Sequence, residues 1–473
     1  MLVLQDLSYA LRSARHRPGF TLVLVAALAL GIGLTTAIFS VFYGVLLRPL
    51  AFHAPERLVL VRERLPKVAP IPINMPAPHA LEFAETPAFS DAAVFIETQR
   101  NAGGADRPER VDCLRASSRL LPVLGLHPAA GRNFTADEDK RGARVALVSQ
   151  AYERKRFGGR DPIGQVLLLD GEPYEVIGVL PRGLAFPTHG MDQPGGSAEV
   201  WLPLSLTPAE RMPNDNFSYS LIARVRDGVT MEQARQAAEV VMKRIANRVP
   251  PEVRAMADLH AALLPVREQM VGDSRRLLVL LLGAVGALLL ITCLNVSNML
   301  LSRAAARRRE IAVRAAMGAS SRRIARQILH ENLLLFAAGG LLGILCASWF
   351  QTLLLRLLPP DLPRTQDIHL DGAVLGFTIA VSLVTALVFG LAPALAALRV
   401  DLTTALQEGS RSQAGGRAIG RTRQVLVAAQ IALAFVLLTS AGLLIRSFAS
   451  VLGQQSELRT EHVLTFGVAL PET

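Results

Sequence analysis

The sequence predicts a polytopic α-helical membrane protein with a large α+β extracytoplasmic domain, and three observations lead to that fold class. Five apolar stretches each exceed the roughly 20 residues that a helix needs to cross a bilayer. Hydrophobic residues make up 51% of the 473 residues, which suits a protein with both a membrane part and a globular part. A polar block, residues 48–274, carries 28 basic and 28 acidic side chains between the first and second stretches.

The elements are expected in a simple order along the chain. Residues 1–18 form an amphipathic interfacial helix, since Leu4, Leu7 and Leu11 share one face. The first span is too long for the apolar core of a signal peptide, so we expect an uncleaved anchor. The five spans are residues 19–47, 275–302, 328–358, 373–398 and 425–446. Between them lie a loop at 303–327, an outer loop at 359–372 and a Gly-rich linker at 399–424.

Charge predicts the orientation of the spans. Residues 303–326 carry eight arginines against one glutamate, and residues 1–18 and 399–423 are also basic. By the positive-inside rule these three segments are cytoplasmic, which places the N-terminus inside and the large domain outside. The net charge of +11 therefore reflects topology and contact with membrane lipids, and it does not indicate nucleic-acid binding.

The polar block has the alternating signals of a mixed α and β domain. Strands are expected at 58–61, 145–148, 166–169, 175–179 and 219–225, with Gly171 as a hairpin turn. Helices are expected at 118–124, 150–157 and 231–248, the last capped by Thr230 and forming a split βαβ module with the strand before it. The Pro/Gly-rich stretches 66–78 and 181–203 predict irregular loops, and 137–139 a charged turn. Cys113 is the block's one cysteine, so it cannot form an internal disulfide.

The layout of spans predicts an internal duplication. The apolar stretch at 425–446 repeats the first span, and residues 447–473 would begin a second outer domain. Two such halves in a longer chain would pair as a pseudo-dimer.

Three stretches of sequence resemble one family. They are LALGIGLTTAIFSVFYGVLLRPL with the following PERLV, RRREIAVRAAMGAS at 307–320, and an outer segment with GRNF at 131–134, DPIG at 161–164 and WLPL at 201–204. Together they resemble the MacB/FtsX-type ABC transporter permeases, and the duplicated layout resembles the duplicated orphan permeases. The resemblance implies a bacterial inner-membrane protein with a MacB-like periplasmic core domain and a separate cytoplasmic ATPase as partner.

The resemblance implies that the inner loop docks on that ATPase. A short helix with exposed arginines beside an acidic residue offers salt bridges to a cytosolic protein, and a glycine after it separates it from the next span. The alternative is that the arginines only set topology and contact lipid headgroups. The residues expected to couple to the ATPase are Arg307, Arg308, Arg309, Glu310, Arg314 and Gly318.

Polar and small residues inside the spans favour helix packing over chemistry. Asn295, Asn298 and Ser302 share one face of the second span, where hydrogen bonds between helices are the favoured interpretation and a substrate path is the alternative. Gly31 and Gly33 would let the first span approach a neighbour closely.

The sequence predicts no enzyme, cofactor or metal site. None of the four lysines follows a glycine, so the P-loop sequence Gly-Lys-Ser/Thr is absent. His330–Glu331 begins like a zinc-protease helix, but Leu334 occupies the position of the second ligand. The predicted function is therefore a permease that transmits the partner's ATP hydrolysis mechanically to its outer domain, for export or efflux. The alternative is a scaffold or signalling protein that regulates a periplasmic partner protein.

Overall fold

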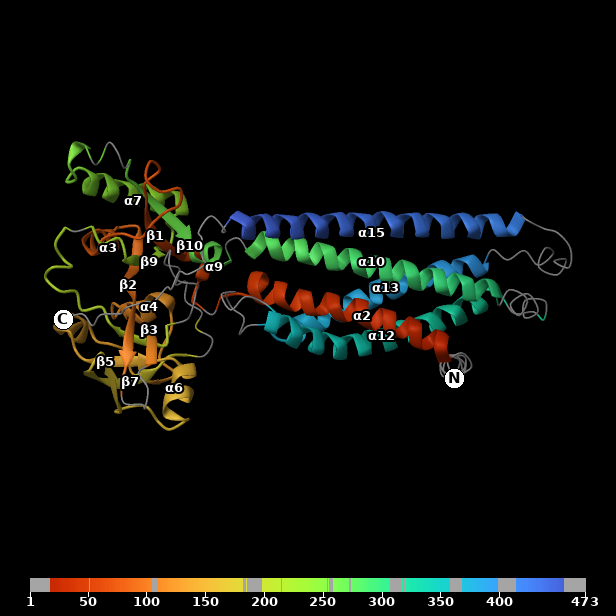
Figure 1. Ribbon diagram of the computed structural model, residues 1–473, viewed down its shortest axis with the longest axis horizontal. Coiled ribbons are helices and arrows are strands. Elements are labelled where there is room, and N and C mark those ends of the chain that lie inside the picture. Colours follow the sequence, from red (N-terminus) through yellow and green to blue (C-terminus); the bar gives the residue numbers. More distant parts are fainter. Residues whose placement is uncertain are drawn as a thin grey trace. The chain divides into compact units, whose positions relative to one another are not determined.

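A computed structural model describes residues 18–50, 52–103, 109–181, 184, 198–213, 215–252, 254, 258–271, 274–306, 317, 320–357, 368–398 and 414–454 (Figure 1). The chain divides into a unit of membrane helices and an outer unit that runs from Arg48 to Asp273. The expected interfacial helix at 1–18 lies almost entirely outside the described residues.

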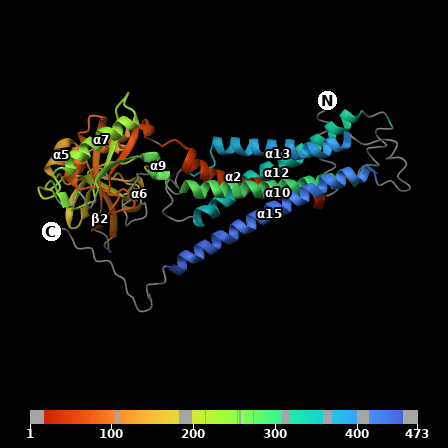
Figure 2. The same cartoon turned by 90° about the horizontal axis from the view of Figure 1, so that it is seen from above.

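Five helices of the first unit are long and apolar enough to cross a membrane. With the sheet domain between the first and second of them, they confirm the predicted fold class. Their bounds are α2 (Pro18–Phe42), α10 (Ser274–Ala306), α12 (Ser321–Leu357), α13 (Gly372–Leu398) and α15 (Ala414–Gln454). Helices α2, α10, α12 and α13 lie along one another in Figures 1 and 2, whereas α15 runs at an angle to them in Figure 2.

Helix α15 is longer than the sequence suggests. It contains 41 residues, or about 62 Å, against a bilayer core of about 30 Å. Residues 414–424, expected to belong to the linker, form its first turns. Extending a helix from an apolar span costs far less than nucleating one, so the glycines there do not prevent it.

One half of the outer unit is a split βαβ arrangement, as predicted. Strand β1 (Leu58–Arg64) lies between β9 (Ser220–Val225) and β10 (His260–Pro265) and is antiparallel to both. Helix α7 (Met231–Ala246) connects β9 to β10. Adding β2 (Phe89–Ala102) beside β9 gives the order β10-β1-β9-β2, which is that of a ferredoxin-like sheet. Helix α3 (Ala77–Ala84) and α7 pack together against one face.

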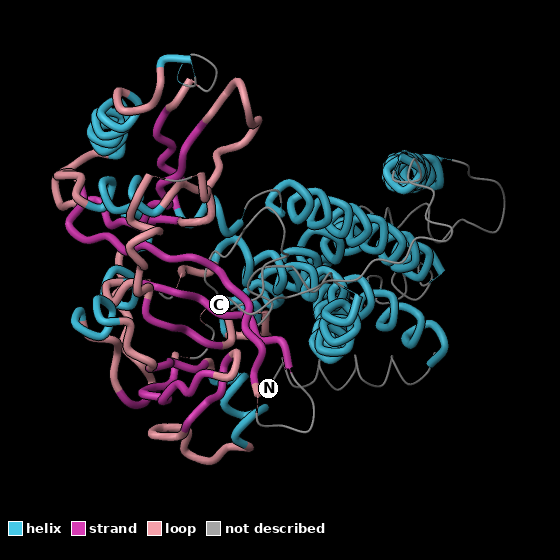
Figure 3. The backbone as a smooth tube through the Cα atoms, turned by 60° about the vertical axis from the view of Figure 1, so that its left-hand side comes forward, coloured by secondary structure: helices cyan, strands magenta, loops and turns pink. Residues whose placement is uncertain are grey.

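The other half is a small barrel inserted between β2 and β9. Its strands pair in the ring β2-β3-β8-β5-β7-β6, and β6 returns to β2 through Ala102 and Leu169. Figure 3 shows these strands in magenta. The remaining members are β3 (Glu109–Ala116), β5 (Val145–Val148), β6 (Val166–Leu169), β7 (Glu172–Val179) and β8 (Val200–Pro203). A short strand, β4 (Ala130–Gly131), extends the sheet beyond β7.

A tight hairpin turn closes the barrel. Asp170 and Gly171 have φ angles of 48° and 82°, as a two-residue type I′ turn requires. The Asp170 carboxylate accepts hydrogen bonds from the Asn101 backbone N–H at 2.9 Å and from Arg100 at 3.0 Å. Burial opposes the charged form, but these hydrogen bonds outweigh it and lower the pKa of Asp170. The turn is therefore fastened to the end of β2.

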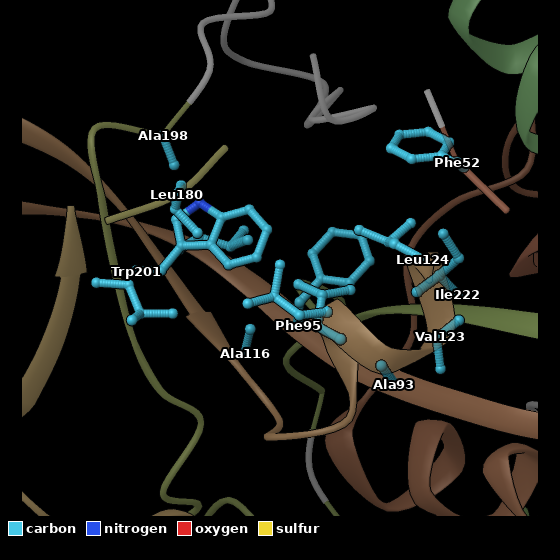
Figure 4. Packing of buried hydrophobic residues seen from close by; sticks show 14 of the residues in the cluster. Phe52, Ala93, Phe95, Ala116, Val123, Leu124, Leu180, Ala198, Trp201 and Ile222 are labelled. Carbon is cyan, nitrogen blue, oxygen red and sulfur yellow. The ribbon is translucent and has the colours of Figure 1, made fainter. Parts of the chain in front are cut away.

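Three apolar clusters fill the outer unit. The ferredoxin-like helices cover one cluster, and Tyr152 on α6 (Gln150–Phe157) lies in the cluster inside the barrel. The third lies on the opposite face of the sheet, where Trp201 and Phe95 are each 2% exposed (Figure 4). Helix α4 (Leu120–Leu124) and the α9 helix (Val266–Val271) contribute to this third cluster.

Two sequence predictions for the outer block need correction. The stretch 181–203 ends in a strand, β8, because Val200–Pro203 pairs with β3 and β5. The acidic residues at 137–139 belong to a short helix, α5 (Ala136–Arg141), in which the Thr135 side chain and Glu138 form a capping box. The Pro-rich stretch at 66–78 is anchored by bridges from Ile73 to Glu63 and from Met75 to Tyr219.

A partly buried polar cluster connects β3 to the residue that precedes β9. Glu210 accepts hydrogen bonds from Arg115 at 2.9 Å, the Tyr219 hydroxyl at 2.6 Å and the Thr207 backbone N–H at 2.7 Å. Burial alone would raise the carboxyl pKa, but these donors outweigh it and lower the pKa of Glu210 to about 2. The cluster thus depends on a charged Glu210.

Candidate functional site in the helix bundle

Glycines on α2 and α12 bring these two helices into backbone contact. A Cβ added at Gly33 would lie 2.8 Å from the Cys346 Cβ and 2.9 Å from the Gly343 carbonyl oxygen. One added at Gly343 would lie 3.1 Å from Ile32. Gly31 faces a different helix, because its added Cβ would meet Thr292 on α10 at 3.1 Å. Such close contacts are how helices associate where the solvent is as apolar as the side chains.

A second interface joins α2 to α13. The Thr36 and Thr378 hydroxyls lie 3.1 Å apart and are buried. One turn further along, the rings of Phe39 and Phe377 stack with centroids 3.6 Å apart and an angle of 8° between their planes. Just beyond, residues Tyr43–Leu47 form a π-helix before the outer unit begins. This end of α2 is therefore fixed to α13 by a hydrogen bond and a ring stack.

The predicted polar face on α10 is only partly enclosed. Asn295 and Ser302 are exposed, whereas the Asn298 Oδ1 atom is buried and has no hydrogen-bond partner among the described residues. The structure therefore gives no hydrogen bond between helices for this Oδ1 atom within the described part of the chain. A hydrogen bond from Asn298 to another helix therefore stays a prediction.

The predicted ATPase-coupling residues are outside the described part of the chain. Arg307, Arg308, Arg309, Glu310, Arg314 and Gly318 all fall within 307–316 or 318–319. The structure places the helices on either side, since α10 ends at Ala306 and α12 begins at Ser321. The Ser320 carbonyl accepts the Arg323 backbone N–H at 2.9 Å and so begins α12.

Sequence reasoning missed a polar group that flanks this loop. Arg303 near the end of α10 lies 3.8 Å from the Glu331 carboxylate on α12, and their side chains are 9% and 11% exposed. Next to Glu331, the Asn332 amide donates to the Gly390 carbonyl of α13 at 3.1 Å. A signal was present, because Glu331 is the single acidic residue in the five membrane-spanning stretches.

Potential metal ligands do not cluster in the described part of the chain. No group of three or more His, Cys, Asp or Glu side chains among the described residues could hold a metal ion. The features of the bundle that could serve a function are the packed helices, the polar group around Glu331 and the arginine-rich sequence between α10 and α12.

Two family models match the chain in tandem. The MacB-like periplasmic core domain matches residues 21–241, and the FtsX-like permease C-terminal domain matches residues 282–402. The first spans α2 and most of the outer unit. The second spans most of α10, the loop, α12 and α13.

Curated relatives share the same region. The pyoverdine export ATP-binding/permease protein PvdT of Pseudomonas syringae pathovar tomato is 32% identical over 60% of this chain and 41% of its own. The macrolide export ATP-binding/permease protein MacB of Bdellovibrio bacteriovorus is 28% identical over 49% and 34%. An uncharacterized ABC transporter permease of Bacillus subtilis, YknZ, is 26% identical over 47% and 53%. The chain therefore spans less than half of the two export proteins.

Solved structures match part of the chain. The periplasmic region of MacB from Actinobacillus actinomycetemcomitans is 14% identical, with a TM-score of 0.34, and covers 46% of this chain and 93% of that one.

The helices and the sheet domain define a multi-pass membrane protein with a periplasmic-type domain. Within that class, the tandem of the two domain models makes the chain a MacB/FtsX-type ABC permease.

Proposed function

We propose that the chain couples ATP hydrolysis by a separate cytoplasmic ATPase to movement of its outer domain, in an export system of the mechanotransmission type. The tandem of a MacB-like core and an FtsX-like domain is the observation that carries this proposal. The printed sequence holds no P-loop, so the energy would come from a partner subunit.

The arginine-rich loop is the proposed docking element. It connects α10 to α12, so a displacement of the loop acts on both helices at once. Arg307, Arg308, Arg309 and Arg314 would bind acidic side chains of the ATPase, while Glu310 would pair with a basic one. In the orientation that the arginine distribution predicts, the loop is cytoplasmic and the outer unit is periplasmic. Export of a small molecule is proposed because two relatives are named for pyoverdine and macrolide export.

The duplicated arrangement remains a prediction of the sequence. It draws support from α15. None of the residues in the most apolar segment of α15 is buried, whereas 56% of the residues in the most apolar segment of α2 are buried. A helix that begins a second unit would be covered by that unit. Sequencing of the coding region beyond residue 473 tests this prediction, and a second outer domain followed by three spans is the expected result.

Co-purification of an ATPase tests the proposed docking. Full-length protein in mild detergent is compared with Glu310→Arg and Gly318→Pro, with Arg356→Gln as a control at the opposite end of α12. We expect the wild type and the control to retain ATP hydrolysis and the two loop variants to lose it. Equal hydrolysis in all four preparations would refute docking through the loop. Absence of any associated ATPase would favour the scaffold or signalling function instead.

A further inference from the structure

One charged group inside the bundle has no role in the proposed docking. The five membrane-spanning stretches cover residues 18–47, 275–303, 326–356, 372–390 and 424–450. Glu331 is the one acidic residue among them, and it lies five residues, or about 7.5 Å along the helix, inside the third stretch. A carboxylate at such a position is costly unless it is paired, and acidic residues inside spans mark functional sites.

Glu331 belongs to a contact group that joins four helices. Its carboxylate lies 3.8 Å from Arg303 of α10, and both side chains are nearly buried. The Arg303 guanidinium also lies over the Phe20 ring of α2, 5.3 Å from its centroid. The neighbouring Asn332 donates to the carbonyl of Gly390 on α13 at 3.1 Å. We call Phe20, Arg303, Glu331, Asn332 and Gly390 the clasp.

The position of the clasp matters more than its contribution to stability. Arg303 comes four residues before Arg307, and Glu331 comes five residues after Arg326. The ion pair therefore joins the two helices directly on either side of the loop. A buried ion pair seldom stabilises a protein more than apolar residues of the same size would, so its retention calls for another explanation. An electrostatic bond between the two helix ends makes them move together.

We propose that the clasp converts displacement of the loop into a joint movement of α2, α10, α12 and α13. Without it, the ends of α10 and α12 could separate or slide when the loop is pushed, and the displacement would be lost. Glu331 and Arg303 are in this sense positioning residues. The inference rests on the proposed function, because it needs an ATPase that acts on the loop.

Thermal unfolding of the full-length protein tests whether the pair exists. The single variants Arg303→Gln and Glu331→Gln each remove one charge of the pair and leave the other without that nearly buried counter-charge, so both should unfold at lower temperature than the wild type. The double variant removes both charges and should recover most of the loss. Arg356→Gln, which is exposed on the same α12 helix, should be neutral. Additive effects of the two single variants would overturn the proposal, whatever the ATPase does.

Hydrogen exchange of the complex with its ATPase tests the role of the pair. In the wild type, trapping ADP with vanadate after ATP hydrolysis should change amide exchange in the outer unit. We expect Glu331→Gln to retain the ATPase and lose this change. The double variant should be nearly as stable as the wild type and still lack the change, because no attraction joins the helix ends. The charge-reversed Arg303→Glu/Glu331→Arg protein should regain at least part of it.

Three results would overturn the inference. Recovery of the exchange change in the neutral double variant would make the pair merely structural. Loss of ATPase binding in Glu331→Gln would assign the pair to docking. A third result is that the variants show the expected non-additive loss of stability but the wild type shows no nucleotide-dependent change in amide exchange. This result would refute the proposed function, and the role of the clasp with it.

Discussion

The Glu210 cluster gives a prediction whose magnitude follows from the structure. Replacing Glu210 with Gln keeps the size of the side chain and removes the charge that Arg115, Tyr219 and Thr207 stabilise. The pKa of Glu210 is about 2 in the folded protein, against 4.5 for an isolated glutamate. At about 1.4 kcal/mol per unit, this difference sets an upper limit of about 3.5 kcal/mol, and solvent screening of the partly exposed side chain lowers the expected contribution at neutral pH to about 1–2 kcal/mol.

The pH dependence has a definite sign. A carboxyl whose pKa is lowered on folding stabilises the protein above its unfolded pKa and loses that effect as the pH falls toward its folded pKa. The difference between the wild type and Glu210→Gln should therefore be greatest above pH 4.5 and should shrink toward pH 2. Glu138, whose pKa is also about 2, titrates in both proteins and cancels in the comparison.

Tryptophan fluorescence can follow the outer unit separately. The chain has two tryptophans, and Trp349 is 85% exposed on α12 while Trp201 is 2% exposed within the sheet domain. In a Trp349→Phe background, urea unfolding monitored through Trp201 measures the stability of that domain at each pH. A difference of about 1–2 kcal/mol at pH 7 that decreases in acid is expected. A difference that is the same at pH 7 and pH 3 would refute the electrostatic argument.

Three further predictions concern packing, capping and barrel closure. Gly33→Leu should destabilise the full-length protein by about 1–3 kcal/mol and so lower its thermal midpoint. Gly283→Leu should not, because a Cβ at Gly283 would meet no atom within 4 Å. Thr230→Ala removes the cap of α7 and should cost about 1 kcal/mol in urea unfolding of the outer unit, with unchanged slope. Asp170→Asn should lower stability at pH 7 and much less in acid, because the low pKa of Asp170 confines the stabilisation to its charged form, and a pH-independent loss would contradict this.

Local signals in the sequence predicted much of the outer unit. Strands β5 and β6 and helix α6 have the bounds expected from their residue patterns. Thr230 caps α7 as expected, because capping depends only on the next few residues. Gly171 marks its hairpin for the same reason.

Elements that depend on distant residues were not predictable in this way. Strand β8 sits in a Pro/Gly-rich stretch and owes its form to β3 and β5, which lie far away in the sequence. Closure of the barrel joins Ala102 to Leu169, a pairing that no local pattern encodes. The ion pair at Glu331 shows the same limit, since the sequence reveals an isolated acid in a span but not its arginine.

Strand β2 has a mechanical consequence for the outer unit. Its 14 residues, about 46 Å of extended chain, run from the ferredoxin-like sheet into the barrel. Val94 and Ile96 pack under the helices of the first half, and Ala102 packs inside the second. The strand pairs with β9 over Phe89–Phe95 and with β3 over Phe95–Ala102, so the two pairings meet at Phe95. A bend between the two halves would therefore disturb a residue whose backbone hydrogen bonds belong to both of them.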